Sequence, residues 1–226
     1  MSHRPPVGLR TLGTGPVQCR LVLVRHGEPV NAVLGVVGGP TGDTGLTDAG
    51  RAQAACLAAR LEASGELAEA TALYASSLPR AIETAQVLAP ALGGLEPVVR
   101  HDLREHDPGD LDGLTWAEAE ARYALPDFDA EPHKPVGPGG ESLTGFHLRA
   151  RTALGDLALR HPGATVVVCC HGGIVAAAVG MVFDVDPSVR VLLPTAYCSM
   201  TEVDRVERGW RLARYNDRYP VRDDLA

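Results

Sequence analysis

The sequence is poor in aromatic residues, in basic residues and in long apolar runs. Aromatic residues make up 4% of its 226 residues and hydrophobic residues 45%, so we expect a core built from Ala, Val and Leu. The formal net charge is −7, whereas recognition of a nucleic-acid backbone usually needs a basic stripe. No apolar run approaches the roughly 18 residues that span a bilayer. The composition therefore argues against nucleic-acid and membrane partners.

Paired cysteines are also lacking. The five cysteines are an odd number without CxxC or zinc-ribbon spacing, so we interpret them as reduced and mostly buried. Cys169 and Cys170 are expected to serve strand packing rather than redox chemistry. Residues 1–18 contain prolines and glycines but no apolar signal-peptide segment. They predict a flexible tail and, by default, a cytoplasmic protein.

Residues 19–226 have the length and composition of a single α/β domain, with no internal repeat or linker. Apolar runs alternate with helix-forming segments, which implies right-handed βαβ units and a mostly parallel central sheet covered on both faces. The predicted N-caps are Thr47, Ser77 and Ser142. Strands are expected over 21–24, 71–74, 97–100 and 165–170, helices over 48–64, 79 to about 93, 115–123, 143–160 and 174–183, and a closing hairpin over 197–203 and 210–215.

Two segments have the composition of loops. Residues 29–45 are rich in glycine and could form a mobile wall of a site. Residues 124–141 contain four prolines and a Gly-Pro-Gly-Gly run, which suggests a lid-like insertion. Substrate specificity is expected to come from these segments, although neither shows a readable pocket. The terminal hairpin could add an edge to the sheet or pair between chains, so the oligomeric state stays open, a homodimer included.

Two buried strands end in a histidine followed by glycine. The run before Arg25 leads into Arg25-His26-Gly27, and 165–170 leads into His171-Gly172. Ligands of an open α/β sheet bind beyond the carboxyl ends of the strands, so these side chains are expected to point into one crevice. An imidazole can act as nucleophile or base, and a guanidinium suits phosphate or carboxylate. Arg80 is expected near a helix N-terminus, where exposed amides already favour an anion.

A third segment, 101–113, is dense in titratable side chains and ends in turn residues. Loops of this kind often carry function. From the residues alone, a general acid in this loop could be any of several side chains. The candidates are Glu105, Asp102, His106, Asp107 and Asp110.

A set of short motifs between about Arg20 and Phe183 resembles, in identity and order, those of the histidine phosphatase superfamily, the phosphoglycerate mutase-like group. The combination is far more specific than any single motif. The residues that carry the resemblance are Arg25-His26-Gly27-Glu28 with Asn31, Leu46-Thr47 with Gly50 and Gln53, Ser76 to Ala85 around Arg80, Leu103-Arg104-Glu105 with Gly109, Pro138-Gly139-Gly140-Glu141-Ser142, and His171-Gly172.

The resemblance implies a three-layer α/β/α sandwich and a phosphatase that hydrolyses a small phosphate monoester through a phosphohistidine. His26 looks like the nucleophile and Glu105 like the general acid and base. The implied phosphate pocket contains Arg25, Arg80 and His171, and the implied substrate-binding residues are Asn31, Gly172 and, in a supporting role, Glu28. This scheme requires no metal and no cofactor, and its partner is a small phosphorylated substrate.

Physical chemistry supports the same assignment. A nucleophilic imidazole must be neutral on its attacking nitrogen, with its other N–H held by an acceptor such as a backbone carbonyl. Two arginines and a second histidine could neutralise the charge on the equatorial phosphate oxygens. The leaving alkoxide needs a proton, which an acid opposite His26 would supply.

Three alternative functions stay open. A mutase would return the phosphoryl group to its substrate, but the residues around Arg122, His133 and Lys134 do not match the basic arrangement of the family's mutases, and the segment after Asn31 lacks an arginine that many members carry. A metal-dependent phosphoesterase could use the His and Asp residues of 101–112, although their spacing fits no known metal site. A non-catalytic protein could bind a phospholigand on the same fold.

Overall fold

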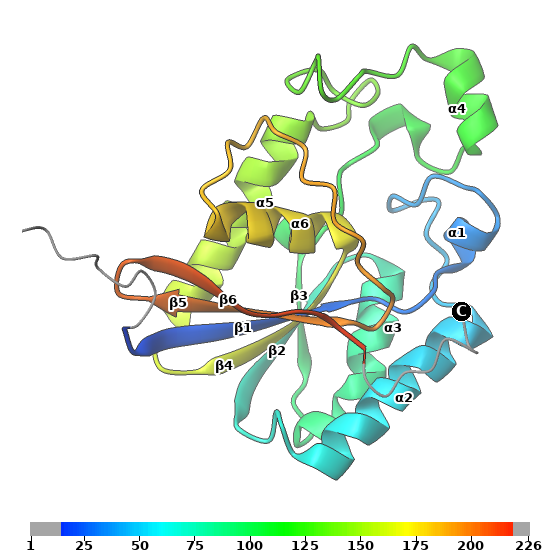
Figure 1. Ribbon diagram of the computed structural model, residues 1–226. Helices are drawn as coiled ribbons and strands as arrows, with labels where there is room; N and C mark the ends of the chain where they lie inside the picture. Colours follow the sequence, from blue (N-terminus) through cyan, green and yellow to red (C-terminus); the bar gives the residue numbers. More distant parts are fainter. Residues whose placement is uncertain (1–14, 219–226) are drawn as a thin grey trace, which may run out of the picture.

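A six-stranded sheet runs through the part of the chain that the computed structural model describes, residues 15–218 (Figure 1). Its order is β3-β2-β4-β1-β5-β6. The first four of these strands are mutually parallel, and β5 and β6 add an antiparallel edge. The strands are β1 (Val17–Arg25), β2 (Ala70–Ser76), β3 (Pro97–Arg100), β4 (Thr165–Cys170), β5 (Met200–Val206) and β6 (Gly209–Asp217). The predicted α/β class and mostly parallel sheet are confirmed.

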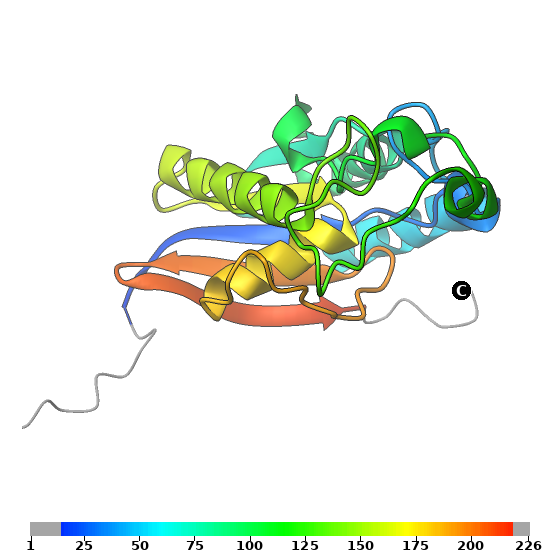
Figure 2. The ribbon, with the colours of Figure 1, turned by 90° about the horizontal axis from the view of Figure 1, so that it is seen from above.

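Helices cover both faces of the sheet, as Figure 1 and, from the side of α5 and α6, Figure 2 show. Leu21 and Leu23 of β1 pack with α5 and α6, whereas Val22 and Val24 pack with α2 and α3. This alternation follows from the two-residue period of a strand. The helices are α1 (Val30–Val33), α2 (Asp48–Ser64), α3 (Pro79–Leu88), α4 (Trp116–Arg122), α5 (Leu143–Arg160) and α6 (Gly172–Val182).

Two of the three predicted N-caps are confirmed, those of α2 and α5. Thr47 and Ser142 cap α2 and α5 by accepting a hydrogen bond from the amide three residues on. The N-cap of α3 is Leu78, so the predicted cap at Ser77 is wrong. Ser76 instead accepts from the amide of Leu78 at 3.2 Å, and the Ser77 hydroxyl bonds the ring of His101. The serine one position earlier than predicted thus accepts a backbone N–H at the start of α3.

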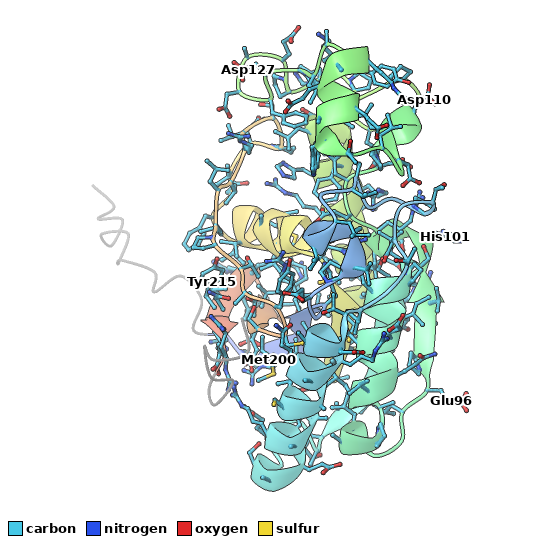
Figure 3. The ribbon with its side chains drawn as sticks, turned by 90° about the vertical axis from the view of Figure 1, so that its right-hand side faces the viewer. Glu96, His101, Asp110, Asp127, Met200 and Tyr215 are labelled. Atoms are coloured by element: carbon cyan, nitrogen blue, oxygen red, sulfur yellow. The ribbon has the colours of Figure 1, made fainter. Side chains whose placement is uncertain are left out.

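The predicted loops pack against each other. Residues 29–45 contain the four-residue helix α1, which the sequence analysis missed. Residues 124–141 contain no helix or strand, and Val136 packs with Val37, Leu111 and Ala119 in a small separate cluster. The Asp112 carboxylate accepts hydrogen bonds from three backbone amides of the first loop, those of residues 39, 41 and 42. Figure 3 shows Asp110 and Asp127 at the end of the molecule that these loops form.

Most of the tail expected over 1–18 lies outside the described residues, and Val17 and Gln18 already belong to β1. The closing hairpin adds β5 to the sheet beside β1. Within residues 15–218, no helix is both long and apolar enough to cross a membrane. Arg25 at the end of β1 is in register with Cys170 at the end of β4. The histidines that follow these strands, His26 and His171, therefore leave the sheet at the same edge.

Candidate active site

His26 is fixed in one tautomer by its two hydrogen bonds. Its ring is 4% exposed. Nδ1 lies 2.7 Å from the carbonyl oxygen of Gly27, and because a carbonyl only accepts, Nδ1 carries the proton. Nε2 is then the acceptor, and Nε–H of Arg80 donates to it over 3.1 Å. The geometry leaves Nε2 as the ring nitrogen with a lone pair.

The surroundings of His26 oppose its protonation. Burial lowers the pKa of His26 well below its ordinary value, and the charges of Arg80 and Arg25 act in the same direction. The hydrogen bond to the Gly27 carbonyl opposes this shift without reversing it. A neutral imidazole is the nucleophilic form. The pocket thus favours the neutral form of His26.

Arg80 is held by a carboxylate that the sequence analysis missed. It lies in the first turn of α3 and is 4% exposed. Its Nη1 donates to Asp43 at 2.9 Å and to the carbonyl of Gly38 at 2.9 Å, and its backbone amide also donates to Asp43. Asp43 is buried in the glycine-rich loop before α2. This loop reaches α3 only in the folded chain, so no local sequence pattern predicts the contact between Asp43 and Arg80.

Arg25 has no carboxylate partner of this kind among residues 15–218. Its Nη1 donates to the carbonyl of Thr195, and the ring of Tyr197 lies 4.2 Å from its Cζ. Its Nε is buried and has no hydrogen-bond partner among the same residues. Burial lowers the pKa of Arg25. Because the ordinary pKa of an arginine is far above neutral pH, Arg25 keeps its positive charge. Thr195 and Tyr197, between α6 and β5, are further residues that the sequence analysis missed.

His171 lies beside His26. It is fully buried, its ring centroid is 5.2 Å from that of His26, and its Nε2 bonds the Ser76 hydroxyl at 2.7 Å. Burial lowers the pKa of His171 well below its ordinary value, and Arg80 adds to the effect. Its Nδ1 is buried and has no partner within the described residues. The ring therefore keeps one nitrogen unused by the protein.

Glu105 reaches the start of α6. Its Oε2 accepts from the amide of Gly173 at 3.0 Å and its Oε1 from the amide of His106 at 3.1 Å. A Cβ at position 173 would collide with Oε1, so any larger residue there would displace the Glu105 carboxylate. Arg149 donates to the carbonyl of Glu105 at 3.2 Å and forms an ion pair with Glu141 at 2.6 Å. The loop that carries Glu105 is thus fastened to α5.

Three of the four other candidate acids of this loop are engaged elsewhere. Asp102 forms an ion pair with Arg100, and Asp107 pairs with Arg104 at 3.5 Å. The ring of His106 bonds the carbonyl of Glu141 at 2.8 Å. The described residues contain no group of three or more His, Cys, Asp or Glu arranged to hold a metal. Of the carboxylates with described contacts in this loop, Glu105 is the one bonded to the N-terminus of α6.

The three residues assigned to substrate binding take different positions. The Asn31 side chain donates to the carbonyl of Val36 at 3.1 Å, and its Oδ1 is buried with no partner in the described part of the chain. Glu28 accepts from the Thr47 hydroxyl at 2.7 Å, which ties the turn after β1 to the start of α2. Gly172 packs against Arg25, whose Nε would lie 3.7 Å from a Cβ at that position. The supporting role of Glu28 in substrate binding stays a prediction.

A family model described as the histidine phosphatase superfamily, branch 1, matches residues 21–218. The match covers every residue of the site. It runs beyond the segment whose motifs carried the resemblance and includes the β5–β6 hairpin.

Named relatives agree with that match. Phosphoglycerate mutase-like protein 4 of Arabidopsis thaliana is 39% identical over 161 residues, 69% of this chain and 67% of the relative. The metal-independent phosphoserine phosphatase of the same plant is 34% identical over 160 residues, 70% of this chain and 66% of the relative. The chain thus spans about two thirds of the length of these relatives. A solved mycobacterial glucosyl-3-phosphoglycerate phosphatase has a TM-score of 0.71 and 27% identity, covering 89% of this chain and all of that chain (100%).

Proposed function

The chain belongs to the histidine phosphatase superfamily, branch 1, and we propose that it hydrolyses a small phosphate monoester through a phosphohistidine on His26. The observation that carries the proposal is the tautomer of His26. Its proton is held on Nδ1 by a carbonyl, and its Nε2 faces the guanidinium of Arg80. A phosphate oxygen entering beside Nε2 would take over the Arg80 N–H and place phosphorus in reach of the lone pair.

In the proposed first step, Nε2 of His26 attacks phosphorus and the bond from phosphorus to the ester oxygen breaks. Arg25, Arg80 and His171 stabilise the charge on the phosphoryl oxygens. Glu105 gives its proton to the leaving oxygen. In the second step, Glu105 takes a proton from water, the water oxygen bonds phosphorus and the bond to Nε2 breaks. Inorganic phosphate and the regenerated enzyme are the products.

The names of the relatives suggest where to look for the substrate. One is a phosphoserine phosphatase and another a glucosyl-3-phosphoglycerate phosphatase. Both names describe phosphate esters of small carboxylic acids. We therefore place this chain's substrate among phosphorylated small carboxylic acids.

Hydrolysis is preferred over mutase activity because of where the candidate basic residues lie. Arg122 and Lys134 are exposed, and each pairs with a glutamate three or four residues away on its own segment. Neither contacts the site residues described above. A mutase must retain the dephosphorylated acid until the phosphoryl group returns to it, which needs more basic contacts than hydrolysis does, and neither of these two residues is placed to supply one.

The test is a hydrolysis screen with inorganic phosphate as the readout. The panel holds phosphoserine, glucosyl-3-phosphoglycerate, 3-phosphoglycerate, sugar phosphates and nucleotides, each with and without EDTA. Phosphate release that survives EDTA supports the proposal. Interconversion of 3- and 2-phosphoglycerate without net phosphate release would replace it with the mutase, and loss of activity in EDTA would replace it with a metal-dependent esterase. Phosphate binding without turnover on the whole panel would favour the binding protein.

A further inference from the structure

Arg25 makes main-chain and side-chain contacts with one short segment of the chain, residues 195–199. Its backbone amide donates to the carbonyl of Ser199 at 3.2 Å, and its carbonyl accepts from the amide of Cys198 at 2.9 Å. Its side chain donates to the carbonyl of Thr195 and lies over the ring of Tyr197. Both the main chain and the guanidinium of Arg25 are thus held by 195–199.

This segment is itself fastened and strained. Cys198 has φ 52, a left-handed conformation that is uncommon for a residue other than glycine. The amide of Ala196 donates to the side chain of Asn216 at 2.8 Å, and the Tyr215 hydroxyl donates to the carbonyl of Pro194 at 2.6 Å. Contacts from β6 therefore hold the segment in a conformation that presents Tyr197 to Arg25.

The ring of Tyr197 touches two residues of the site. It lies 4.2 Å from Cζ of Arg25, and its centroid is 5.7 Å from the His26 ring. An aromatic face attracts a guanidinium and fixes its plane without neutralising its charge. A carboxylate in the same place would position Arg25 equally well but would cancel the charge that a phosphate needs. Arg80 already has such a carboxylate in Asp43.

We propose that Tyr197 is a positioning residue for phosphate binding, which holds the guanidinium of Arg25 beside His26 while leaving its positive charge and its Nε–H for the ligand. The proposal rests on the proposed function, because it takes the ligand of Arg25 to be a phosphoryl group. The buried, unpartnered Nε of Arg25 is the donor that this ligand would use.

The experiment measures calorimetric binding of inorganic phosphate to the full-length protein and to two variants of Tyr197. Tyr197→Leu removes the ring, and Tyr197→Phe keeps it. A cation–π contact between half-buried groups is worth up to about tenfold in an equilibrium constant, so Tyr197→Leu should weaken phosphate binding by about tenfold. Tyr197→Phe should recover it to within about threefold. Tyr197→Met, which also lacks a ring, replaces the Leu variant should that one fail to fold.

The protein offers a matched control in the hairpin. Arg205 lies over the ring of Trp210 at 5.6 Å, the same kind of contact without site residues nearby. Trp210→Leu should leave phosphate affinity unchanged. A double-mutant cycle completes the test, because Tyr197→Leu made in an Arg25→Gln protein should change phosphate affinity by less than about twofold.

Two results would overturn the proposal: equal phosphate affinity in the Leu and Phe variants, or a tenfold loss that persists in the Arg25→Gln protein. Either would make Tyr197 merely structural. Failure of the proposed function has a different signature, since a wild-type protein that binds phosphate without hydrolysing any ester contradicts the phosphatase alone. A wild-type protein that neither binds phosphate nor hydrolyses any ester contradicts both.

Discussion

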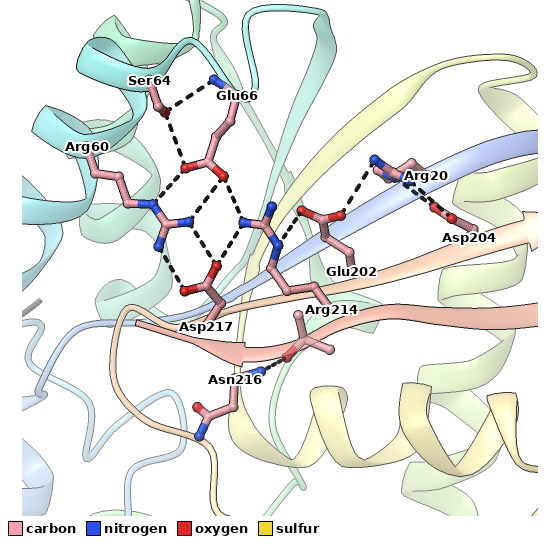
Figure 4. A network of polar contacts seen from close by, with 10 residues as sticks. Arg20, Arg60, Ser64, Glu66, Glu202, Asp204, Arg214, Asn216 and Asp217 are labelled. Atoms are coloured by element: carbon pink, nitrogen blue, oxygen red, sulfur yellow. Dashed lines mark hydrogen bonds and ion pairs between the residues drawn. The ribbon is translucent and has the colours of Figure 1, made fainter. Parts of the chain in front are cut away.

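The molecule uses arginines in two regions, the candidate active site and an ion-pair network on β1, α2, β5 and β6. The arginines of these two regions differ in their partners. In the network, drawn in part in Figure 4, each arginine contacts at least one carboxylate, and most contact two or more. In the site, Arg80 has one carboxylate, Asp43, and Arg25 has an aromatic ring instead. The network consists of Arg20, Arg60, Arg211 and Arg214 with Glu66, Glu202, Asp204 and Asp217.

The difference separates a structural use of charge from a binding use. In the network, burial alone would raise the pKa of Glu66, but hydrogen bonds from Arg60 and Arg214 outweigh it and lower that pKa. The four arginines of the network are matched by four carboxylates, so the network has no unbalanced charge that could bind a ligand. In the site, Asp43 contacts Arg80, and no carboxylate of residues 15–218 forms an ion pair with Arg25. A buried guanidinium without an ion-pair partner costs stability in the absence of an anion and favours binding of one.

The largest expected effect comes from removing a site arginine. Arg80→Met should lower kcat/KM by about 10³-fold, because a buried donor aimed at transition-state charge is lost. Arg214→Met removes an arginine of the network and should change kcat/KM by less than about twofold. Steady-state kinetics on one ester measure both. Comparable losses in the two variants would erase the distinction between the regions.

The carboxylates of the two regions should differ as well. Glu105 is bonded by backbone amides rather than by an arginine side chain, so its carboxylate is not locked in an ion pair. Glu105→Gln should lower kcat by about 10²-fold on an alkyl phosphate, since general acid catalysis is lost. On p-nitrophenyl phosphate, whose leaving group needs no proton, the loss should be much smaller. Equal losses on both esters would contradict the acid role.

Asp43→Asn separates positioning from charge. The substitution increases the net positive charge of the site but weakens the hold on Arg80. A charged hydrogen bond is worth about 1.5 to 3 kcal/mol, so we expect kcat/KM to fall by about thirtyfold. The salt dependence of KM, recorded alongside, should change little. A gain in activity would mean that net charge matters more than the placement of Arg80.

The buried histidines and the carboxylates of the network affect the free energy of unfolding in different pH ranges. The pKa values of His26 and His171 lie well below 6.5 in the folded protein, so the unfolded chain binds more protons. Their contribution to stability is fully present above about pH 6.5 and is lost as pH falls toward the folded pKa. Network carboxylates such as Asp204, whose pKa is lowered, contribute stability that is lost only below about pH 4.5.

Urea titrations at pH 7.5, 6.5 and 5.5 measure this dependence. The free energy of unfolding should fall on acidification by up to about 1.4 kcal/mol per pH unit for each histidine. His26→Gln should reduce the slope. An unfolding free energy that stays constant from pH 6.5 to 5.5 would show that these rings are not buried as neutral groups.

The sequence predicts the scaffold better than the contacts that tune the site. The strands 97–100 and 165–170 were predicted with the bounds that the structure has, because apolar runs and turn residues are local signals. The motif residues of β1, α3 and α6 carry the site, so the meeting of His26, Arg80 and His171 also followed from the pattern of strand and helix ends.

The missed residues have no local signal of this kind. Asp43 lies 37 positions from Arg80 in a glycine-rich loop, and Tyr197 lies in an irregular segment between α6 and β5. Each matters through a partner that only the tertiary fold supplies. The cap at Ser77 failed for a related reason, since Ser76 and Ser77 are equivalent in a local pattern and their contacts with His171 and His101 distinguish them.

The most direct test of the account is to trap the phosphoryl group on the protein. An ester labelled in its phosphate is mixed with the enzyme and quenched in base within one turnover, and the labelled peptide is identified. We predict an acid-labile label on His26 that is chased into inorganic phosphate, together with no label and no turnover in His26→Ala. Label on another residue, or turnover that persists in His26→Ala, would contradict the account.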